Sequence, residues 1–235
     1  MAKIKSIPRV GRSKKVLGSK KELKATDKIE VLHKRIRTLE AKLRILEDIE
    51  EIKKLQRIYG YYLDNKLWDE TIDLFSDHTE SIEIGGRGVY LGKKGAEIFF
   101  KKVLGGGRYG RQPGELHNHM QLQGIVTVDP GGKTAKGRWR AFTQMADLFP
   151  NEIKARWGEG VYEIEYVKDN GKWKFKKMHW YRTFSTPYEE GWAKTSTGGL
   201  EPSIEFPPDA PPTVHEPYPS TYVVPFHYKH PITGK

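Results

Sequence analysis

The first regular pattern of apolar residues along the chain is a heptad seam between residues 26 and 46. Apolar residues recur there at spacings of three and four, with Lys, Arg and Glu between them: Ile29, Leu32, Ile36, Leu39, Leu43 and Leu46. This spacing is typical of a coiled-coil helix. Asp27 followed by Glu30 resembles a capping box at its start. Because the seam is shorter than about three heptads, we expect it to reinforce an oligomer formed elsewhere or to pack on its own domain.

From about residue 48 the apolar spacing changes, and the pattern up to about residue 190 indicates an α+β domain. The helix turns a new apolar face, Ile49 to Ile58, toward a globular core. Shorter helical patterns and a strand follow at 67–75, 80–84 and 94–104, and then four long strand patterns at 119–129, 134–146, 153–168 and 172–184. Helices followed by an antiparallel meander predict helices packed on one face of a curved sheet.

Turn sequences and prolines mark the borders of these elements. DPGG at 129–132 and DNG at 169–171 are hairpin signals. Nine of the 14 prolines lie between Pro202 and Pro231, which excludes a helix or a central strand there. This segment is also rich in aromatic residues, so we expect an extended arm that wraps the domain or a neighbouring subunit. The predicted parts are therefore a basic tail, a coiled-coil-like helix, an α+β roll and a proline-rich arm: 1–25, 26–47, 48–190 and 191–235.

The net charge of +11 is concentrated in that basic tail. Residues 1–25 carry nine Lys or Arg against one acid, whereas the other 210 residues carry a net charge of only +3. Such a tail is typically solvated and disordered, and a nucleic-acid-binding arm is the less favoured alternative. We therefore expect no nucleic-acid partner for the folded part.

The amino-acid composition excludes several other kinds of site and of protein. The chain has no cysteine, which excludes disulfides, thiolate metal sites and a cysteine nucleophile. No apolar run approaches the length of about 18 residues that a membrane helix needs. The basic N-terminus lacks the apolar core of a secretory signal, so we expect a cytoplasmic protein without a membrane partner.

The stretch GELHNHMQLQG, residues 114–124, carries the most informative polar pattern. By strict strand alternation His117, His119, Gln121 and Gln123 share one face, which predicts a wet or ligand-lined surface. A bulge after the histidines would instead turn Gln121 and Gln123 outward. Histidine can act there as an acid or a base. Alternatively, the pair could bind a metal with Asp64 or Glu163, or could be ordinary hydrogen-bonded structure. We expect no metal, because no other spacing completes a site, and the H-N-H letters lack the ββα context of a nuclease.

Taken together, the elements resemble the cone-shaped α+β roll of the nuclear-transport-factor-2-like superfamily, in its SnoaL-like branch. The resemblance covers about 48–185 and rests on four stretches: IYGYYLDNKLWDE, GVYLGKKGAEIFF, LHNHMQLQGIVTVD and GKWKFKKMHW. It implies helices packed on a curved antiparallel sheet, with an N-terminal helix and an extended C-terminal arm. It does not fix the reaction, since the superfamily includes isomerases, dehydratases, epoxide hydrolases, cyclases and binding modules.

Within that branch the chain is similar to cofactor-free lyases, and this similarity implies four catalytic residues. The bile-acid and scytalone dehydratases use a helix Tyr and Asp and a strand His, with a late Arg in the bile-acid enzyme. Here the matching positions are Tyr59, Asp64, His119 and Arg182. The residues alone leave alternatives open, because Asp64 could cap the next helix and Tyr59 could be core. Arg182 is always charged and would need Asp64 or a substrate phenolate as its partner.

Five further residues are predicted to bind substrate: Tyr62, His117, Gln121, Trp157 and Trp180. Their aromatic rings suit a flat aromatic substrate, although core packing alone would also explain the tryptophans. Arg138 and Arg140 share a face that we interpret as solvated. The glycine-rich stretch at 105–114 is interpreted as a mobile loop over the pocket mouth.

The C-terminal stretch PFHYKHPITGK departs from those dehydratases. It resembles instead the diarylpropane lyases of lignin-dimer catabolism, which lose formaldehyde without a cofactor and give stilbenes. The resemblance therefore predicts a cofactor-independent lyase on a bulky hydroxylated aromatic compound, working as a dimer or trimer. The alternatives are a simple dehydratase and a non-catalytic ligand-binding or scaffold module.

Overall fold

The structure is a computed structural model, and it describes residues 25–149, 152–196 and 200–235. The predicted basic tail therefore lies outside the described residues, apart from Ala25. By its contacts the chain divides into two compact units, Met1–Ala41 and Lys42–Lys235. No helix in the described part of the chain is both long and apolar enough to cross a membrane.

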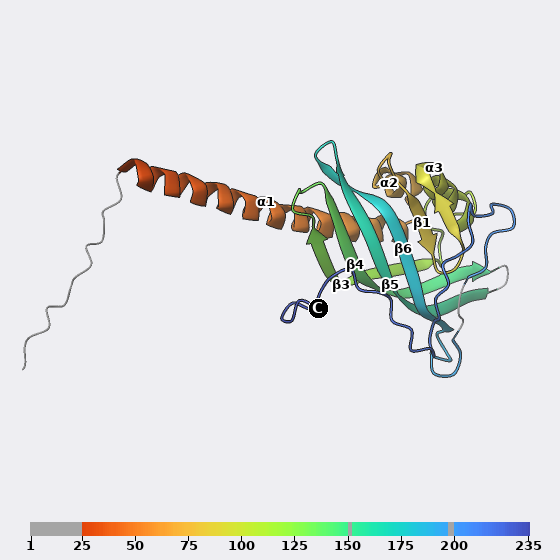
Figure 1. Cartoon of the computed structure of the whole chain (residues 1–235). Coiled ribbons are helices and arrows are strands. Elements are labelled where there is room, and N and C mark those ends of the chain that lie inside the picture. Colours follow the sequence, from red (N-terminus) through yellow and green to blue (C-terminus); the bar gives the residue numbers. More distant parts are fainter. Residues whose placement is uncertain (1–24, 150–151, 197–199) are drawn as a thin grey trace, which may run out of the picture. The chain divides into compact units, whose positions relative to one another are not determined.

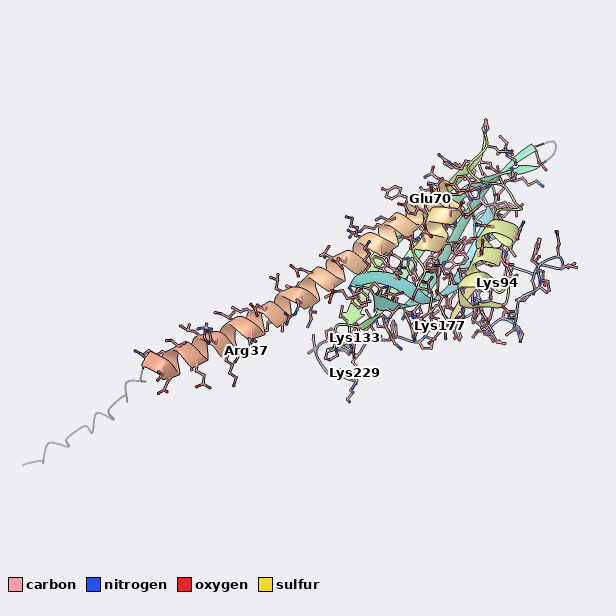
Figure 2. The ribbon with its side chains drawn as sticks, turned by 90° about the horizontal axis from the view of Figure 1, so that it is seen from above. Arg37, Glu70, Lys94, Lys133, Lys177 and Lys229 are labelled. Carbon is pink, nitrogen blue, oxygen red and sulfur yellow. The ribbon has the colours of Figure 1, made fainter. Side chains whose placement is uncertain are left out.

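The first element is one continuous helix, α1 (Ala25–Asp64), which runs through the predicted boundary at residue 48. Every residue from 25 to 47 is exposed, and Figure 2 shows side chains on all sides of this stretch. Burial begins at Asp48 and continues through Ile52, Leu55, Tyr59 and Leu63. These spacings of three and four place one face of the helix in the core, as the change of pattern predicted.

The second unit is built on a six-stranded curved sheet in the order β2-β1-β6-β5-β4-β3 (Figure 1). The strands are β1 (Ser81–Ile84), β2 (Val89–Leu91), β3 (Leu116–Val128), β4 (Thr134–Phe149), β5 (Glu152–Asp169) and β6 (Lys172–Pro187). Four neighbouring pairs are antiparallel, as the predicted meander requires, but β1 runs parallel to β6. The sheet is therefore mixed. The parallel pairing is possible because a long crossover, rather than a hairpin, connects β1 and β6.

Three short helical segments and α1 supply the rest of the core. They are α2 (Trp68–Asp73), α3 (Gly92–Glu97) and the π-helix η1 (Ile98–Leu104), which continues α3 directly. Their buried side chains meet the concave face of the sheet in one aromatic cluster around Tyr59, Phe75, Phe100 and Phe175. Helices packed on one curved sheet are the predicted α+β roll.

Strand β3 contains a bulge that the alternation rule did not predict. Its register against β4 shifts between Leu122 and Ile125, and Gln123 has a φ of 50°. Glycine is needed at position 124, because a Cβ there would lie 2.2 Å from the ring of Trp139. Of the two alternatives, the bulge therefore holds for Gln123: it is exposed, and its side chain accepts a hydrogen bond from Arg140.

The C-terminal segment crosses the edge and the convex face of the sheet as an extended chain. Ala210 bridges to Val89 on β2, and the backbone of Tyr218 donates to Thr183 on β6. Farther on, Arg138 on β4 donates to the carbonyl of Val224. Hydrogen bonds to main-chain atoms of the arm thus hold it on its own domain.

Candidate active site

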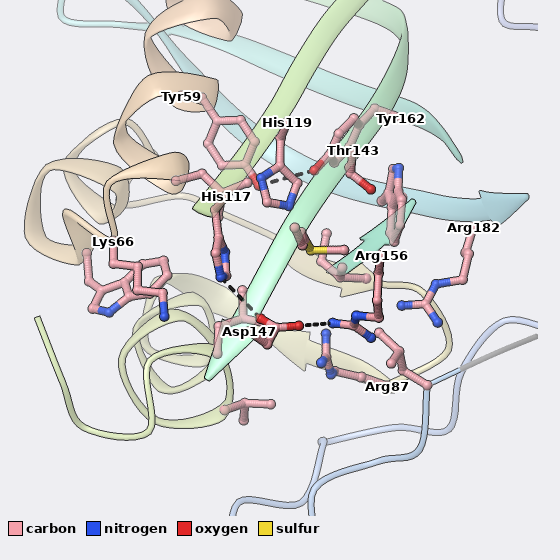
Figure 3. A pocket seen from close by; sticks show the side chains of 18 residues that line it. Tyr59, Lys66, Arg87, His117, His119, Thr143, Asp147, Arg156, Tyr162 and Arg182 are labelled. Atoms are coloured by element: carbon pink, nitrogen blue, oxygen red, sulfur yellow. Dashed lines mark hydrogen bonds and ion pairs between the residues drawn. The ribbon is translucent and has the colours of Figure 1, made fainter. Parts of the chain in front are cut away.

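A cavity of about 190 Å³ opens between the concave face of the sheet, the end of α1 and η1 (Figure 3). Its wall is partly apolar, with Leu63, Trp68, Val103, Leu104 and Trp180. The polar side chains come from several elements that are far apart in sequence: Tyr59, Lys66, Arg87, His117, His119, Thr143, Asp147, Arg156, Tyr162 and Arg182. A cavity in which apolar walls meet convergent polar groups is typical of a small-molecule site.

The central contact of the cavity joins β3 to the last turn of α1. The Asp64 Oδ1 atom lies 2.8 Å from Nδ1 of the His119 ring and also accepts the backbone N–H of His119 at 2.7 Å. Both side chains are mostly buried. A carboxylate on Nδ1 favours the tautomer with its proton there, which leaves Nε2 as the basic nitrogen. In the described part of the chain Nε2 makes no hydrogen bond, and the ring lines the cavity.

A glycine permits this contact. Gly60 lies one turn before Asp64 on α1, and a Cβ at Gly60 would come 3.1 Å from Cγ of Gln121 and 3.3 Å from the carbonyl oxygen of His119. The helix can therefore approach β3 closely at this point. That approach places the carboxylate of the following turn on His119.

Two buried phenols lie beside the histidine. The hydroxyls of Tyr59 and Tyr162 are 3.5 Å apart, and their rings meet edge to face. Burial raises the pKa of both phenols well above the ordinary value, and the nearby Asp64 carboxylate adds to the effect. Both groups therefore stay protonated at neutral pH and can donate hydrogen bonds to an oxygen in the cavity.

A second histidine pair occupies another part of the wall. His117 Nε2 lies 3.2 Å from Oδ1 of Asp147, while the Arg156 guanidinium binds Oδ2 of the same carboxylate at 2.6 Å. Burial alone would raise the pKa of Asp147, but the contacts with His117 and Arg156 outweigh it and lower that pKa to about 2. Asp147 is therefore ionised at neutral pH, and it ties His117 to a cation.

Hydroxyl and guanidinium groups complete the polar wall. The Thr143 hydroxyl is buried and makes no hydrogen bond with any described residue. Arg182, on β6, is buried beside Trp180, with its guanidinium carbon 5.7 Å from the ring centre. Such donors can stabilise a developing negative charge on a bound molecule.

Comparison with known proteins agrees with this architecture. The family described as the SnoaL-like domain matches residues 44–179, more than half of the chain. The chain belongs to the SnoaL-like domain family. The match covers α1 from its buried part onward and most of the sheet.

Solved structures of similar fold place this SnoaL-like domain among small α+β proteins. A protein assigned as a scytalone dehydratase of Novosphingobium aromaticivorans is 18% identical, with a TM-score of 0.51 over 68% of this chain and 96% of its own. LinA is 20% identical, with a TM-score of 0.52 over 63% and 93%. A type 2 hexachlorocyclohexane dehydrochlorinase (LinA) is 19% identical, with a TM-score of 0.52 over 68% and 99%. At these identities the likeness shows the fold alone.

The SnoaL-like domain and the end of β6 that follows it bring all four predicted catalytic residues to one region. Tyr59, His119 and Arg182 line the cavity, and Asp64 reaches it through His119. Asp64 does not cap α2, because the N-cap residue of α2 is Leu67 and no side chain makes a capping hydrogen bond there. Their catalytic roles remain a prediction.

Of the five residues predicted to bind substrate, the SnoaL-like domain places only His117 and Trp180 in the cavity wall. Trp157 faces away from the cavity and stacks on Tyr188. Gln121 lies under α1, where its side chain bonds to Gln56. Tyr62 is half-buried on α1 and does not line the cavity.

The glycine-rich loop is more constrained than the predicted mobile lid. The Trp68 indole donates to the carbonyl of Arg108 at 2.8 Å, and Gly110 donates to the carbonyl of Lys66. Tyr109 binds Glu70 on α2. The loop is therefore tied to the helices at several points.

The sequence reading missed Thr143, Asp147, Arg156, Tyr162 and Arg87. The first two could have been found, because alternation from Trp139 along the predicted strand leads to Thr143 and then toward Asp147 on the same face. The same alternation places Arg156 and its neighbour Trp157 on opposite faces of β5. Arg87 lies in a turn, where no periodic signal exists.

A metal site finds no geometric support in the residues that the structure describes. No group of three or more His, Asp or Glu side chains there could hold an ion. Of the two candidate third ligands, Asp64 holds His119, while Glu163 faces the other side of the sheet and binds Arg138 and His227.

Proposed function

We propose that this protein is a cofactor-independent lyase acting on a bulky hydroxylated aromatic compound. The observation that carries the proposal is the His119–Asp64 pair, whose Nε2 atom is left available in a cavity walled by aromatic rings. Two structural neighbours are named as a dehydratase and a dehydrochlorinase, and both names describe eliminations. An elimination needs a base near the proton and a donor near the leaving group, and His119 and the phenols are suited to these tasks.

In its sharpest form the proposed substrate is a diarylpropane-1,3-diol. His119 takes the proton of the terminal hydroxyl, and that O–H electron pair becomes the C=O bond of formaldehyde. The adjacent C–C bond breaks, its electrons form the C=C bond of a stilbene, and the benzylic hydroxyl leaves with one proton as water. The atoms balance as diol to stilbene, formaldehyde and water, so the scheme requires no oxidant or reductant.

The remaining residues have supporting roles in this scheme. Asp64 holds His119 in the tautomer that leaves Nε2 basic. Tyr59, protonated because it is buried, donates a hydrogen bond to the departing hydroxyl. Arg182 stabilises a phenolate or alkoxide that forms during the reaction.

The test uses the purified full chain and two matched compounds. One is a diarylpropane-1,3-diol, and the other is the 1,2-diarylethanol that lacks only the terminal hydroxymethyl group. Stilbene absorbance and formaldehyde are measured together, with and without a metal chelator. We expect equal amounts of both products from the diol, no formaldehyde from the ethanol, and a loss of activity in His119→Gln.

Three outcomes would contradict the proposal. Stilbene from the ethanol, together with a hydroxymethyl-substituted stilbene and no formaldehyde from the diol, would indicate a simple dehydratase. Unchanged turnover in His119→Gln would remove the proposed base. Binding of both compounds without any product would favour a ligand-binding module.

A further inference from the structure

One side of the cavity carries three arginines from three different elements. Arg87 comes from the turn between β1 and β2, Arg156 from β5 and Arg182 from β6. Figure 3 shows the three guanidinium groups on the side of the cavity away from Tyr59 and His119. Because the three residues are distant in sequence, their convergence is a property of the fold.

Few acidic groups of the described residues line this part of the cavity. Among the described residues that line the cavity, Asp147 is the only carboxylate, and it already contacts both Arg156 and His117. Arg87 has no carboxylate within 4.0 Å in the described part of the chain. The remaining cation of the wall, Lys66, is compensated separately by Glu115 at 2.8 Å.

Burial and neighbouring positive charges disfavour the charged forms of Arg87 and Arg182. Burial lowers the pKa of Arg182 to about 9, and the charges of Arg87 and Arg156 contribute to the decrease. Burial likewise lowers the pKa of Arg87 to about 10, with Arg156 as the next cause. All three groups nevertheless remain charged at neutral pH, so this side of the cavity is strongly positive.

We propose that this side of the cavity binds a carboxylate, so that the substrate is an aromatic carboxylic acid whose acid group rests on Arg87, Arg156 and Arg182. This inference rests on the proposed function, since it concerns the substrate of the same site, and it replaces the phenolate or alkoxide on Arg182 in that scheme by the carboxylate of the substrate. A guanidinium presents a planar fork of N–H donors that matches the two oxygens of a carboxylate better than the single oxygen of a phenolate. The acid group would be held apart from His119, which leaves the reacting carbons near the base.

The test measures binding rather than turnover, so it does not depend on the reaction. Three probes of similar shape are compared by calorimetry on the full chain: stilbene-4-carboxylate, stilbene-4-carboxamide and 4-hydroxystilbene. We expect the carboxylate to bind at least about tenfold more tightly than the other two, which is a modest difference for a charge-assisted contact. Arg87→Gln should remove most of that preference, whereas Arg140→Gln, on the opposite face of the sheet, should leave it unchanged.

Equal affinity for the acid and the amide would overturn this inference, and so would equal loss of preference in the two variants. Tight binding of hydroxystilbene would point to a phenolate instead and would also overturn it. These results are separable from the proposed function. A protein that prefers the acid but forms no stilbene refutes only the lyase, and one that forms stilbene without any preference refutes only the carboxylate site.

A second and independent inference concerns α1. The six apolar residues of its seam, from Ile29 to Leu46, are each between 50% and 60% exposed. The β-branched residues Ile29 and Ile36 occupy a positions, and leucines occupy all three d positions: Leu32, Leu39 and Leu46. This combination favours a parallel two-stranded coiled coil.

The charged residues on either side of the seam also favour a parallel two-stranded coiled coil. In a parallel, in-register pair each g residue faces the e residue of the next heptad on the other copy. Arg35 would then face Glu40, and Lys42 would face Glu47. An antiparallel pair would instead bring the cationic g residues together, and also the acidic e residues.

We infer that two copies of this chain pair through residues 28–47 as a parallel, in-register coiled coil. The absence of cysteine from the natural chain allows a clean cross-linking test. Leu39→Cys places thiols at facing d positions, whereas Lys34→Cys places them at outward f positions. Under mild oxidation of the full chain we expect covalent dimers with Leu39→Cys and few with Lys34→Cys, and Glu40→Lys should reduce the yield. Equal cross-linking at both positions, or a monomer by sedimentation at every concentration, would overturn the inference.

Discussion

Arginines on the two faces of the same sheet have different environments. On the convex face Arg138 pairs with Glu163 at 3.0 Å and Arg140 pairs with Glu159, so each cation has its own carboxylate. On the concave face three arginines share a cavity with one described carboxylate, Asp147. On the convex face each arginine is thus matched by a carboxylate, whereas on the concave face three cations surround one carboxylate.

The comparison separates structural from functional use of similar residues. Histidines follow the same division: His227, which belongs to the arm, is held by Glu163 on the convex face, whereas His119 keeps one ring nitrogen available in the cavity. Residue type alone therefore does not identify a site. The partner of each residue and the face on which it lies carry the information.

The largest expected difference between the faces is in catalysis. His119→Gln removes the proposed base and should lower kcat by about 100-fold or more in the stilbene assay. The matched convex variant, His227→Gln, should change kcat by less than about twofold. A similar loss in both variants would show that the fold, rather than the base, is being disturbed.

The next effect concerns stability. Because the pKa of Asp147 is lowered to about 2 in the folded protein, its ionised form stabilises the fold at neutral pH. Asp147→Asn should therefore lower the free energy of unfolding at pH 7 by about 2 kcal/mol. That contribution is present above the unfolded pKa near 4 and is lost as pH falls toward about 2, so urea titrations should show the gap narrowing below pH 4. The convex variant Glu165→Gln, whose carboxylate forms an exposed pair with Lys136, should cost less, about 1 kcal/mol at most; a larger loss there would contradict the comparison.

A smaller effect should follow from the close approach of α1 to the concave face. Gly60→Ala adds a Cβ 3.1 Å from Gln121 and should displace Asp64 from His119. We expect kcat to fall by about tenfold with KM little changed, because the geometry of the base is altered while the cavity remains. Tyr61→Ala, an exposed neighbour on the same helix, is the control. If kcat did not fall in Gly60→Ala, the helix would be able to move without affecting the His119–Asp64 pair.

The smallest effect should come from the two tryptophans that the sequence treated alike. Trp180→Leu removes part of the cavity wall and should raise KM several-fold, whereas Trp157→Leu should leave kcat and KM within about twofold. Both variants should be compared at equal folded fraction, measured by thermal unfolding. A raised KM in Trp157→Leu alone would reverse the assignment of faces.

The fold was largely predictable because its helices and strands carry strong periodic patterns. The helix face from Ile52 to Leu63 and the meander after residue 116 followed directly from spacing and turn residues. The parallel pairing of β1 with β6 was not predictable in this way. Periodicity identifies strands, but it carries no information about which distant strand becomes a neighbour.

The site was predictable only where a resemblance added to the residues. Tyr59, Asp64, His119 and Arg182 were located from family likeness, and the structure brings them to one cavity. Arg87 could not be found, because a turn residue becomes part of a cavity only through tertiary packing. Gln121 was misjudged because alternation gives the face of a strand but does not show that α1 covers this part of it.

The bulge in β3 divides that strand into two segments, and the alternation of concave-facing and convex-facing side chains in one is independent of that in the other. Before it, odd-numbered residues such as His117 and His119 face the concave side; after it, even-numbered residues such as Val126 and Val128 do so. Inserting or deleting one residue between His119 and Leu122 would thus rotate both histidines to the convex face without displacing the valines from the core. Evolution could therefore have rewritten the reactive half of this strand while the half that supports folding stayed in place.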